Sequence, residues 1–269
     1  MGGILAIANQ KGGVGKTTTA INLASALAMA ARKVLLVDFD PQGNTTSGLG
    51  VNRAELAHHV YHILINGFPI ADAVVPTAIK NLHLLPAGRD LTGAEIELGE
   101  KPEWEYALAD KLRPFAADYD FVLIDCPPSL GRLTLNAFVA ADGVLVPLQC
   151  EYYAMEGLSQ LLETIAAIRE GLNPRLRPMG IVLTMFDART NLSRQVADEV
   201  KKYFPDLVFE AVIPRSVRLA EAPSHGIPVF LHDIRSSGAG AYLDLSRELL
   251  QRWPAAETAP AEGASGHDG

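Results

Sequence analysis

Residues 8–24 read ANQKGGVGKTTTAINLA, and this stretch decides the expected fold. It follows the apolar run Ile4–Ala8, which predicts a strand, and it opens a helical pattern that extends from Lys16 to Ala31. A strand, a glycine-rich loop ending in Lys-Thr, and a helix in this order are the context of a phosphate-binding P-loop. The sequence therefore predicts an α/β protein with a nucleotide site beside its first strand.

The glycine loop explains how phosphates would be held. Glycine backbones come close to phosphate oxygens and adopt positive φ angles, so the loop amides and the helix N-terminus point at the anion. Lys16 supplies a charge to the β- and γ-phosphates, and Thr17 offers its hydroxyl to Mg²⁺. The expected nucleotide-binding residues of the loop are Gly12, Gly13, Val14, Gly15, Lys16, Thr17 and Thr18.

The rest of the chain alternates between strand and helix patterns. Most strand runs are continuously apolar, which is typical of strands buried on both faces of a parallel sheet. The further expected strands are Val34–Asp38, Leu82–Pro86, Phe121–Asp125, Val144–Leu148, Gly180–Met185 and Val208–Ile213. The further expected helices are Glu103–Leu112, Leu133–Ala141, Met155–Glu170, Arg194–Tyr203 and Tyr242–Trp253. The alternation predicts a doubly wound α/β fold, with a mostly parallel sheet flanked by helices.

Length and composition limit the possibilities further. The chain has 269 residues, and we expect a single domain over 1–253 followed by a disordered acidic tail over 254–269. Cys126 and Cys150 are too few for a disulfide framework and form no zinc pattern, so a reduced, cytoplasmic setting is expected. The first residues do not read as a signal peptide. The net charge of −8 argues against a nucleic-acid partner only if the charge is evenly spread.

Acidic residues follow two of the buried strands. The string LLVDFDPQGN places Asp38 and Asp40 at a strand end, where two carboxylates need a partner such as magnesium or its bound water. In FVLIDCPPS, four apolar residues precede Asp125, which matches a Walker B strand whose acid faces magnesium. We interpret Cys126 as a small buried residue.

Together these motifs resemble one family. The string ANQKGGVGKTTTAINLA resembles the deviant Walker A motif of the ParA/MinD superfamily of P-loop NTPases. The resemblance implies that Lys11 crosses a dimer interface to the partner's nucleotide, and that Asp40 positions or activates the attacking water. The implied catalytic residues are Lys11, Lys16 and Asp40. The implied magnesium-site residues are Thr17, Asp38, Asp40 and Asp125.

The resemblance runs from about Ile4 to Leu250 and points to the chromosomal ParA/Soj group. The strings QCEYYAMEGLSQL, TMFDARTNLSRQV and IPRSVRLAEAPSHGIPV look like segments of that group. Because no N-K-x-D string is present to read guanine, the resemblance implies ATP and ADP as nucleotides. Glu151 would lie at the cofactor near the dimer interface, and Pro214 would form a wall against the adenine.

A DNA surface is implied by the same group. Arg189 and Arg218 match positions where it places DNA-contacting arginines. Residues 189–252 hold nine Lys and Arg against eight Asp and Glu, whereas residues 1–188 hold fourteen against twenty. No aromatic residues are interleaved, so non-sequence-specific double-stranded DNA is expected. The expected DNA-binding residues are Arg189, Arg218, Arg194, Lys201, Lys202 and Arg215, with Arg235 and Arg247 extending the patch.

The resemblance implies a cycle on the nucleoid. ATP and Mg²⁺ bind, two subunits close into a sandwich homodimer, and the dimer binds DNA. Hydrolysis, slow alone and stimulated by a ParB-like centromere-binding protein, releases the DNA.

Three alternatives are weaker. A MinD-like membrane-associated regulator of division needs a basic amphipathic C-terminal helix, whereas Tyr242–Trp253 looks like the closing helix of the fold. An iron–sulfur reductase ATPase needs cluster-ligating cysteines, and neither cysteine lies in such a segment. A nucleotide-binding scaffold without turnover is disfavoured by Lys16, Asp40 and Asp125. The sequence does not distinguish chromosomal from plasmid cargo.

Overall fold

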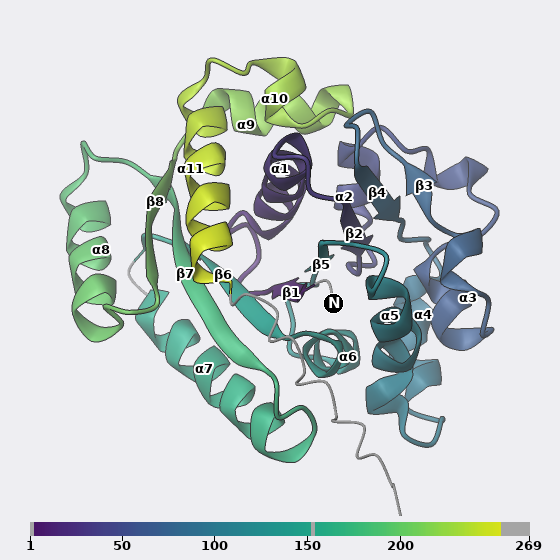
Figure 1. The fold of residues 1–269 in the computed structure, drawn as a ribbon. Coiled ribbons are helices and arrows are strands. Elements are labelled where there is room, and N and C mark those ends of the chain that lie inside the picture. Colours follow the sequence, from purple (N-terminus) through teal and green to yellow (C-terminus); the bar gives the residue numbers. More distant parts are fainter. Residues whose placement is uncertain (1–2, 152–153, 254–269) are drawn as a thin grey trace, which may run out of the picture.

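Eight strands make one twisted sheet in the part of the chain that the structure describes (Figure 1). The computed structural model describes residues 3–151 and 154–253. The strand order is β3-β4-β2-β5-β1-β6-β7-β8, and only β3 runs antiparallel to its neighbour. The strands are β1 (Gly3–Ile7), β2 (Val34–Asp38), β3 (Val75–Pro76), β4 (Leu82–Leu85), β5 (Phe121–Asp125), β6 (Gly143–Gln149), β7 (Arg177–Phe186) and β8 (Val208–Pro214).

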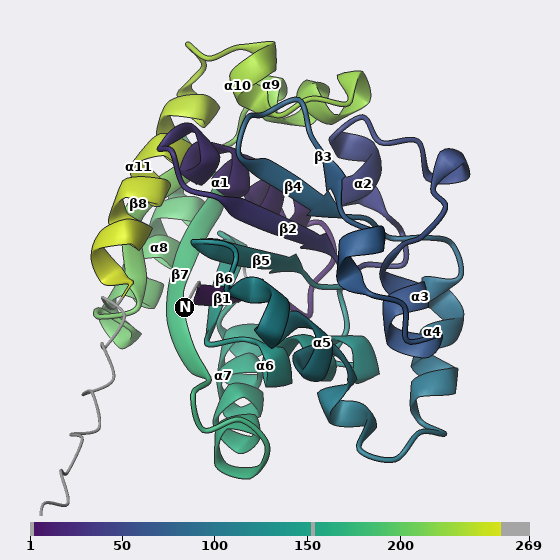
Figure 2. The same ribbon diagram turned by 45° about the vertical axis from the view of Figure 1, so that its right-hand side comes forward.

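Helices cover both faces of the sheet (Figures 1 and 2). The described α-helices are α1 (Lys16–Met29), α2 (Asn44–Gly48), α3 (Val60–Ile65), α4 (Leu91–Leu98), α5 (Ala107–Ala116), α6 (Arg132–Ala140), α7 (Ala154–Gly171), α8 (Asn191–Tyr203), α9 (Val217–Glu221), α10 (Val229–His232) and α11 (Ser237–Arg252). Helices α1, α9, α10 and α11 bury their apolar side chains on one face, and α3 to α8 bury theirs on the other. Short 3₁₀ turns connect them at Arg53–Glu55, Ile70–Asp72, Trp104–Tyr106 and Ala222–His225.

The central strands are apolar throughout because both of their faces are covered. Every residue of β1, β2 and β5 is buried. Helix α1 packs against the sheet and against its neighbour α11 on the same face, which explains why its alanine-rich sequence is buried along most of its length. The Thr19 hydroxyl of α1 and the Tyr242 hydroxyl of α11 form a buried hydrogen bond of 3.1 Å. This bond satisfies the polar group of a side chain that is otherwise core.

Parallel pairing brings the chemically important loops to one edge of the sheet. Asp38 at the end of β2 is the register partner of Asp125 at the end of β5, and Ile7 of β1 is the partner of Asp125 on the other side. The P-loop leaves β1 immediately afterwards. The carboxyl ends of adjacent parallel strands are where doubly wound folds place their ligands.

The predicted fold class is confirmed, and β2 and β5 have the predicted bounds. Strand β4 was predicted to within one residue, but the other elements between Asn44 and Leu98 were missed, because α2, α3, α4 and the two-residue strand β3 are too short to show a period. Helix α11 begins at Ser237, five residues before the predicted start, with the Ser236 side chain accepting from Ala239 N at 3.3 Å. The predicted tail, 254–269, lies outside the described residues. No described helix is both long enough and apolar enough to cross a bilayer.

Candidate nucleotide site at the carboxyl edge of the sheet

The loop between β1 and α1 has the backbone of a phosphate cradle. Gly13 has φ +74° and Gly15 has φ +89°, a left-handed conformation in which a side chain would be strained. Gly15 is the residue before the first turn of α1, so the free amides of that turn lie next to the loop. The 14-residue helix adds its N-terminal dipole to this anion site.

Lys16 lies inside this loop rather than on the surface. Only 7% of the residue is exposed, and Nζ donates to the Lys11 carbonyl oxygen at 3.0 Å. Burial lowers the pKa of Lys16, and the charges of Asp125 and Asp40 oppose that effect. The ammonium group is thus held beside two carboxylates, at the position where the predicted phosphates would lie.

Asp125 is completely buried, and among the described residues only one of its two carboxylate oxygens accepts hydrogen bonds. The hydroxyls of Thr17 and Thr45 donate to its Oδ2 at 2.8 and 2.7 Å, whereas Oδ1 is buried and has no hydrogen-bond partner among the residues that the structure describes. Burial raises the pKa of Asp125 to about 6. A buried, unpartnered carboxylate oxygen beside two hydroxyls fits an oxygen-ligated cation such as Mg²⁺. Thr17 and Asp125, predicted from two distant motifs, are therefore brought into direct contact.

Asp38 and Asp40 are two residues apart but have different partners. Asp38 is fully buried, and its Oδ2 accepts from Thr46 N at 2.7 Å and Thr46 Oγ1 at 2.5 Å. Burial, followed by the charge of Asp125, raises the pKa of Asp38 to about 7. The Asp40 carboxylate accepts from the Gln42 amide at 2.9 Å. Asp38 is thus committed to Thr46, whereas a local turn orients Asp40.

Lys11 forms an ion pair with Glu151 at the open side of the loop. Their side chains are 50% and 43% exposed, so the pair is accessible to solvent. The backbone of the loop is fixed nearby, because Asn9 Oδ1 accepts from Lys11 N at 3.0 Å while Asn9 Nδ2 donates to Pro147 O at 2.8 Å. The structure thus places both predicted interface residues side by side.

Several known proteins are similar to this chain. A family model described as an AAA domain matches residues 2–178. The chain is 57% identical to the chromosome partitioning protein ParA of Myxococcus xanthus, over 94% of this chain and 89% of that protein. It is 55% identical to the sporulation initiation inhibitor protein Soj of Bacillus subtilis, over 93% of this chain and 98% of that protein. The chain belongs to the ParA/Soj family.

A solved structure extends the similarity to three dimensions. It is described as cobyrinic acid a,c-diamide synthase from Mycobacterium smegmatis with bound ADP and magnesium. It superimposes with a TM-score of 0.82 at 41% identity, covering 94% of this ParA/Soj family member and 96% of that chain. The two proteins therefore share one fold, including the nucleotide loop, over nearly the whole length of both chains.

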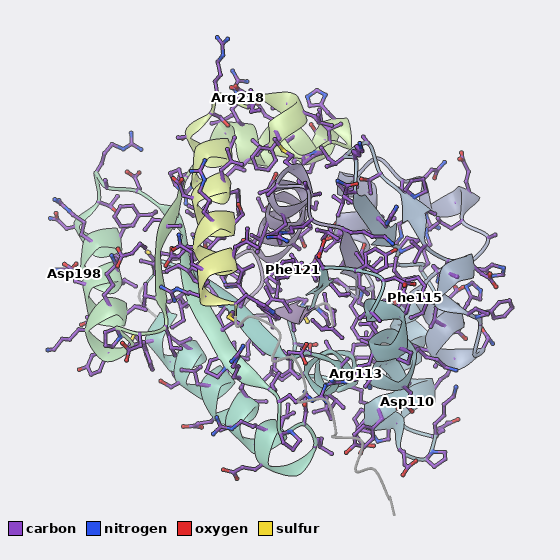
Figure 3. All side chains as sticks on the ribbon, viewed as in Figure 1. Asp110, Arg113, Phe115, Phe121, Asp198 and Arg218 are labelled. Carbon is purple, nitrogen blue, oxygen red and sulfur yellow. The ribbon has the colours of Figure 1, made fainter. Side chains whose placement is uncertain are left out.

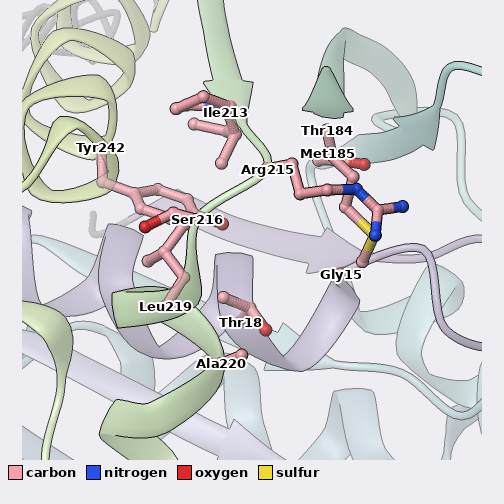
Figure 4. A pocket seen from close by; sticks show the side chains of 11 residues that line it. Gly15, Thr18, Thr184, Met185, Ile213, Arg215, Ser216, Leu219, Ala220 and Tyr242 are labelled. Carbon is pink, nitrogen blue, oxygen red and sulfur yellow. The ribbon is translucent and has the colours of Figure 1, made fainter. Parts of the chain in front are cut away.

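A pocket adjoins the P-loop in this ParA/Soj family member (Figure 4). Met185 in this pocket has φ +49°, an uncommon conformation for a residue with a side chain. Pro214, predicted as an adenine wall, is part of the lining, and so is Arg215, which was predicted to contact DNA. The other lining residues are Gly15, Thr18, Thr184, Ile213, Ser216, Leu219, Ala220 and Tyr242. The pocket is mostly apolar and opens beside the phosphate loop, as a base site would.

The two arginines of this ParA/Soj family member that were predicted to bind DNA are exposed, and each forms ion pairs with carboxylates. The Arg189 guanidinium donates two hydrogen bonds to Asp187, at 2.9 and 2.7 Å, and 87% of the side chain is exposed. Arg218, labelled in Figure 3, contacts Glu221 at 2.9 Å and Asp233 at 3.5 Å. Each arginine is thus held by neighbouring carboxylates on the surface.

The other predicted basic residues are spread along α8. Arg194 lies in its first turns, where it donates to Asn191 Oδ1 at 2.7 Å. Lys201 and Lys202 lie in its last turn, about 10–12 Å farther along the helix at its usual rise per residue. Lys201 is 3.5 Å from Glu210 of β8. These two lysines therefore lie at the opposite end of α8 from Arg194.

Sequence reasoning missed two hydroxyl residues of the site. Thr45 and Thr46 directly follow the predicted acidic segment, and their side chains bind Asp125 and Asp38 respectively. The string GNTT after Asp-Pro-Gln carried the signal, because hydroxyls next to buried carboxylates are their natural donors. Cys126 is buried as predicted, and burial raises the pKa of its thiol.

Proposed function

We propose that this chain is a DNA-partitioning ATPase that dimerises on ATP and binds double-stranded DNA without sequence preference. The observation that carries the proposal is the convergence of Lys16, Thr17, Asp40 and Asp125 at one sheet edge, with Lys11 at its open side. Its cofactors are ATP or ADP and Mg²⁺, which agrees with the ADP and magnesium named for the M. smegmatis structure. Partitioning is preferred over the activity named for that protein, because the curated partitioning relatives are more similar.

Each residue of the site has a role in hydrolysis. The amides of the loop from Gly12 to Thr17 and the Lys16 ammonium bind the phosphates, while the pocket at Pro214 takes the adenine. Thr17 and Asp125 would hold Mg²⁺, with Asp38 supporting the site, and the ion would neutralise charge on the β- and γ-phosphates. Asp40 orients the attacking water, as its position at the end of β2 supports.

Dimer formation requires a rearrangement at Lys11. In the single chain its ammonium is paired with Glu151, so reaching a partner's phosphates requires that this ion pair open. Because the pair is half exposed, breaking it costs little free energy. A cation placed against the transferring phosphoryl group stabilises its charge in the transition state.

DNA binding would use the exposed arginines near the carboxyl ends of β7 and β8. Arg189 and Arg218 carry this assignment, and Arg194, Lys201, Lys202 and Arg215 could add phosphate contacts. Phosphates would replace the carboxylates that now pair with Arg189 and Arg218. Such binding places the protein on the nucleoid, in the cytoplasm. Hydrolysis removes the γ-phosphate contacts, releases the DNA, and is slow until a ParB-like protein stimulates it.

The test measures binding to a random DNA duplex with ATP, with ADP and without nucleotide. With ATP, we expect binding that weakens by about 10³–10⁵-fold between roughly 50 and 200 mM salt if a dimer makes six to ten phosphate contacts. Arg218→Glu should abolish it. Arg169→Glu makes the same charge change on an exposed residue near the end of α7 and should leave binding intact.

Two outcomes would redirect the proposal. Binding that does not depend on nucleotide would separate DNA affinity from the ATP site. An ATP-dependent dimer that binds no DNA would favour the MinD-like alternative, which sedimentation with anionic liposomes would then test.

A further inference from the structure

Arg53 makes an unusual set of contacts beside the nucleotide site. Its guanidinium donates three hydrogen bonds, all to backbone carbonyls: Nη2 to Pro41 at 3.0 Å, Nη1 to Gln42 at 2.6 Å, and Nε to Ala87 at 3.2 Å. It has no carboxylate partner within ion-pair distance among residues 3–151 and 154–253. When the donors of an arginine guanidinium bind backbone carbonyls, the side chain holds those backbone segments in place rather than neutralising a carboxylate.

The chain is shaped to accept this side chain. Asn52 caps the 3₁₀ turn that begins at Arg53, with its Oδ1 accepting from Ala54 N at 3.1 Å. Gly43 has φ +68°, and a Cβ at that position would lie 2.4 Å from the Arg53 Cζ. Glycine at residue 43 thus leaves the room that the guanidinium occupies.

The carbonyl contacts lead directly to Asp40. The amide of Gln42 donates to Asp40 Oδ1 at 2.9 Å, and the carbonyl of the same residue accepts from Arg53. Gln42 is therefore held at both ends, by the Asp40 carboxylate and by the guanidinium. Movement of this backbone unit would turn the carboxylate.

The third contact ties the same loop to the strand beyond. Ala87 follows β4, and its carbonyl accepts from Arg53 while its amide donates to Thr46 Oγ1 at 3.0 Å. Thr46 in turn donates to Asp38. Arg53 thus joins the backbone behind Asp40 to the buried network behind Asp38.

We propose that Arg53 is a positioning residue that holds the Pro41–Gln42 backbone so that Asp40 stays oriented toward the water. This inference rests on the proposed hydrolysis of ATP. It predicts that loss of the guanidinium slows the chemical step and leaves nucleotide affinity nearly unchanged, because none of its hydrogen bonds goes to the phosphate loop.

The test compares single-turnover hydrolysis of ATP by the parental chain, Arg53→Ala and Arg53→Lys. We expect Arg53→Ala to be slower by about 10- to 100-fold, the effect of a small misplacement of a reacting group. Affinity for a fluorescent ATP analogue should stay within about threefold, since less than a factor of ten reflects little lost binding energy. Arg53→Lys keeps the positive charge but lacks the planar guanidinium donors, so its hydrolysis of ATP should remain slow.

Added guanidinium ion separates positioning from general stability. Below unfolding concentrations it should restore part of the Arg53→Ala rate, because it can occupy the space beside Gly43 and donate to the same carbonyls. Arg252→Ala is the matched control: Arg252 also donates to two carbonyls, those of Leu207 and Val208, at 3.2 and 2.7 Å. Its hydrolysis rate should equal that of the parental chain and should not respond to guanidinium.

The outcomes distinguish this inference from the proposed function. Parental hydrolysis with an Arg53→Ala rate within twofold, or a rate loss matched by an equal loss of nucleotide affinity without rescue, would overturn the role of Arg53 alone. A parental chain that hydrolyses no ATP would overturn the proposed function and this inference with it.

Discussion

Asp40 differs from the other buried carboxylates of the site in how few hydrogen bonds it receives among the described residues. Asp125 is held by two threonine hydroxyls and Asp38 by Thr46, whereas Asp40 receives only the amide of Gln42 at its carboxylate in the part of the chain that the structure describes. A carboxylate with free acceptor capacity can orient a water molecule.

We therefore predict that Asp40→Ala hydrolyses ATP at least about 10²-fold more slowly, the usual contribution of a positioned acid or base. Nucleotide should still bind, because the loop and Lys16 remain, and the ATP-bound dimer should accumulate on DNA. Phosphate release and sedimentation with DNA measure both effects. Asp110→Ala, on an exposed position of α5, should behave as the parental chain. Parental hydrolysis by Asp40→Ala would show that another group orients the water.

The junction between α3 and β4 contains a buried histidine. His59 precedes α3 and is 7% exposed, and its ring lies where a side chain on Gly88 would be. Burial, followed by the charge of His62, lowers the pKa of His59, while Asp90 opposes the shift. The charges of Arg53 and His58 also favour the neutral ring. The folded state therefore disfavours protonation of His59.

The sign of the pH effect follows from this shift. The unfolded chain takes up the proton near the ordinary value of 6.5, whereas the folded chain resists it to lower pH. The stability contributed by neutral His59 is present above pH 6.5 and is lost as the pH falls below it, by at most about 1.4 kcal/mol per pH unit.

Urea unfolding at pH 5 and pH 7 measures this effect. We expect the free energy of unfolding of the parental chain to fall toward pH 5, and His59→Phe to reduce that fall while keeping a ring in the same space. His225→Phe, which changes a histidine at an exposed position, should retain the parental slope. Equal slopes in the parental chain and His59→Phe would assign the pH dependence to other groups.

The net charge of the chain affects how two copies can associate. Each chain carries a net charge of −8, so association needs local attraction to overcome overall repulsion. Lys11, half exposed at the open side of the loop, could supply it against the phosphates of a partner.

We predict that ATP with Mg²⁺ doubles the molar mass of the Asp40→Ala chain in sedimentation velocity, and that adding Lys11→Ala prevents the change. Lys80→Ala is the matched control, because Lys80 is exposed just before β4, at the opposite end of the sheet from the loop. A dimer that persists without Lys11 would mean that other contacts hold the interface.

Much of the fold was available from local sequence, and the reason is physical. The P-loop needs glycines at positive φ before a helix, and strands covered on both faces need continuous apolar runs, so both leave a local record. The short elements between β2 and β4 leave no such record. Their helices span only one or two turns and are fixed by packing rather than by a repeating pattern.

The fold class, the phosphate loop and the acidic strand ends could all be predicted from the sequence, because each depends on neighbouring residues. Which of these groups are in contact, in contrast, follows from how the chain folds in three dimensions. Thr17 meets Asp125 across 108 residues, Lys11 meets Glu151 across 140, and Arg53 reaches Ala87 across 34. Such contacts depend on strand order and register, which place distant segments at one edge of the sheet, and no local pattern encodes that order.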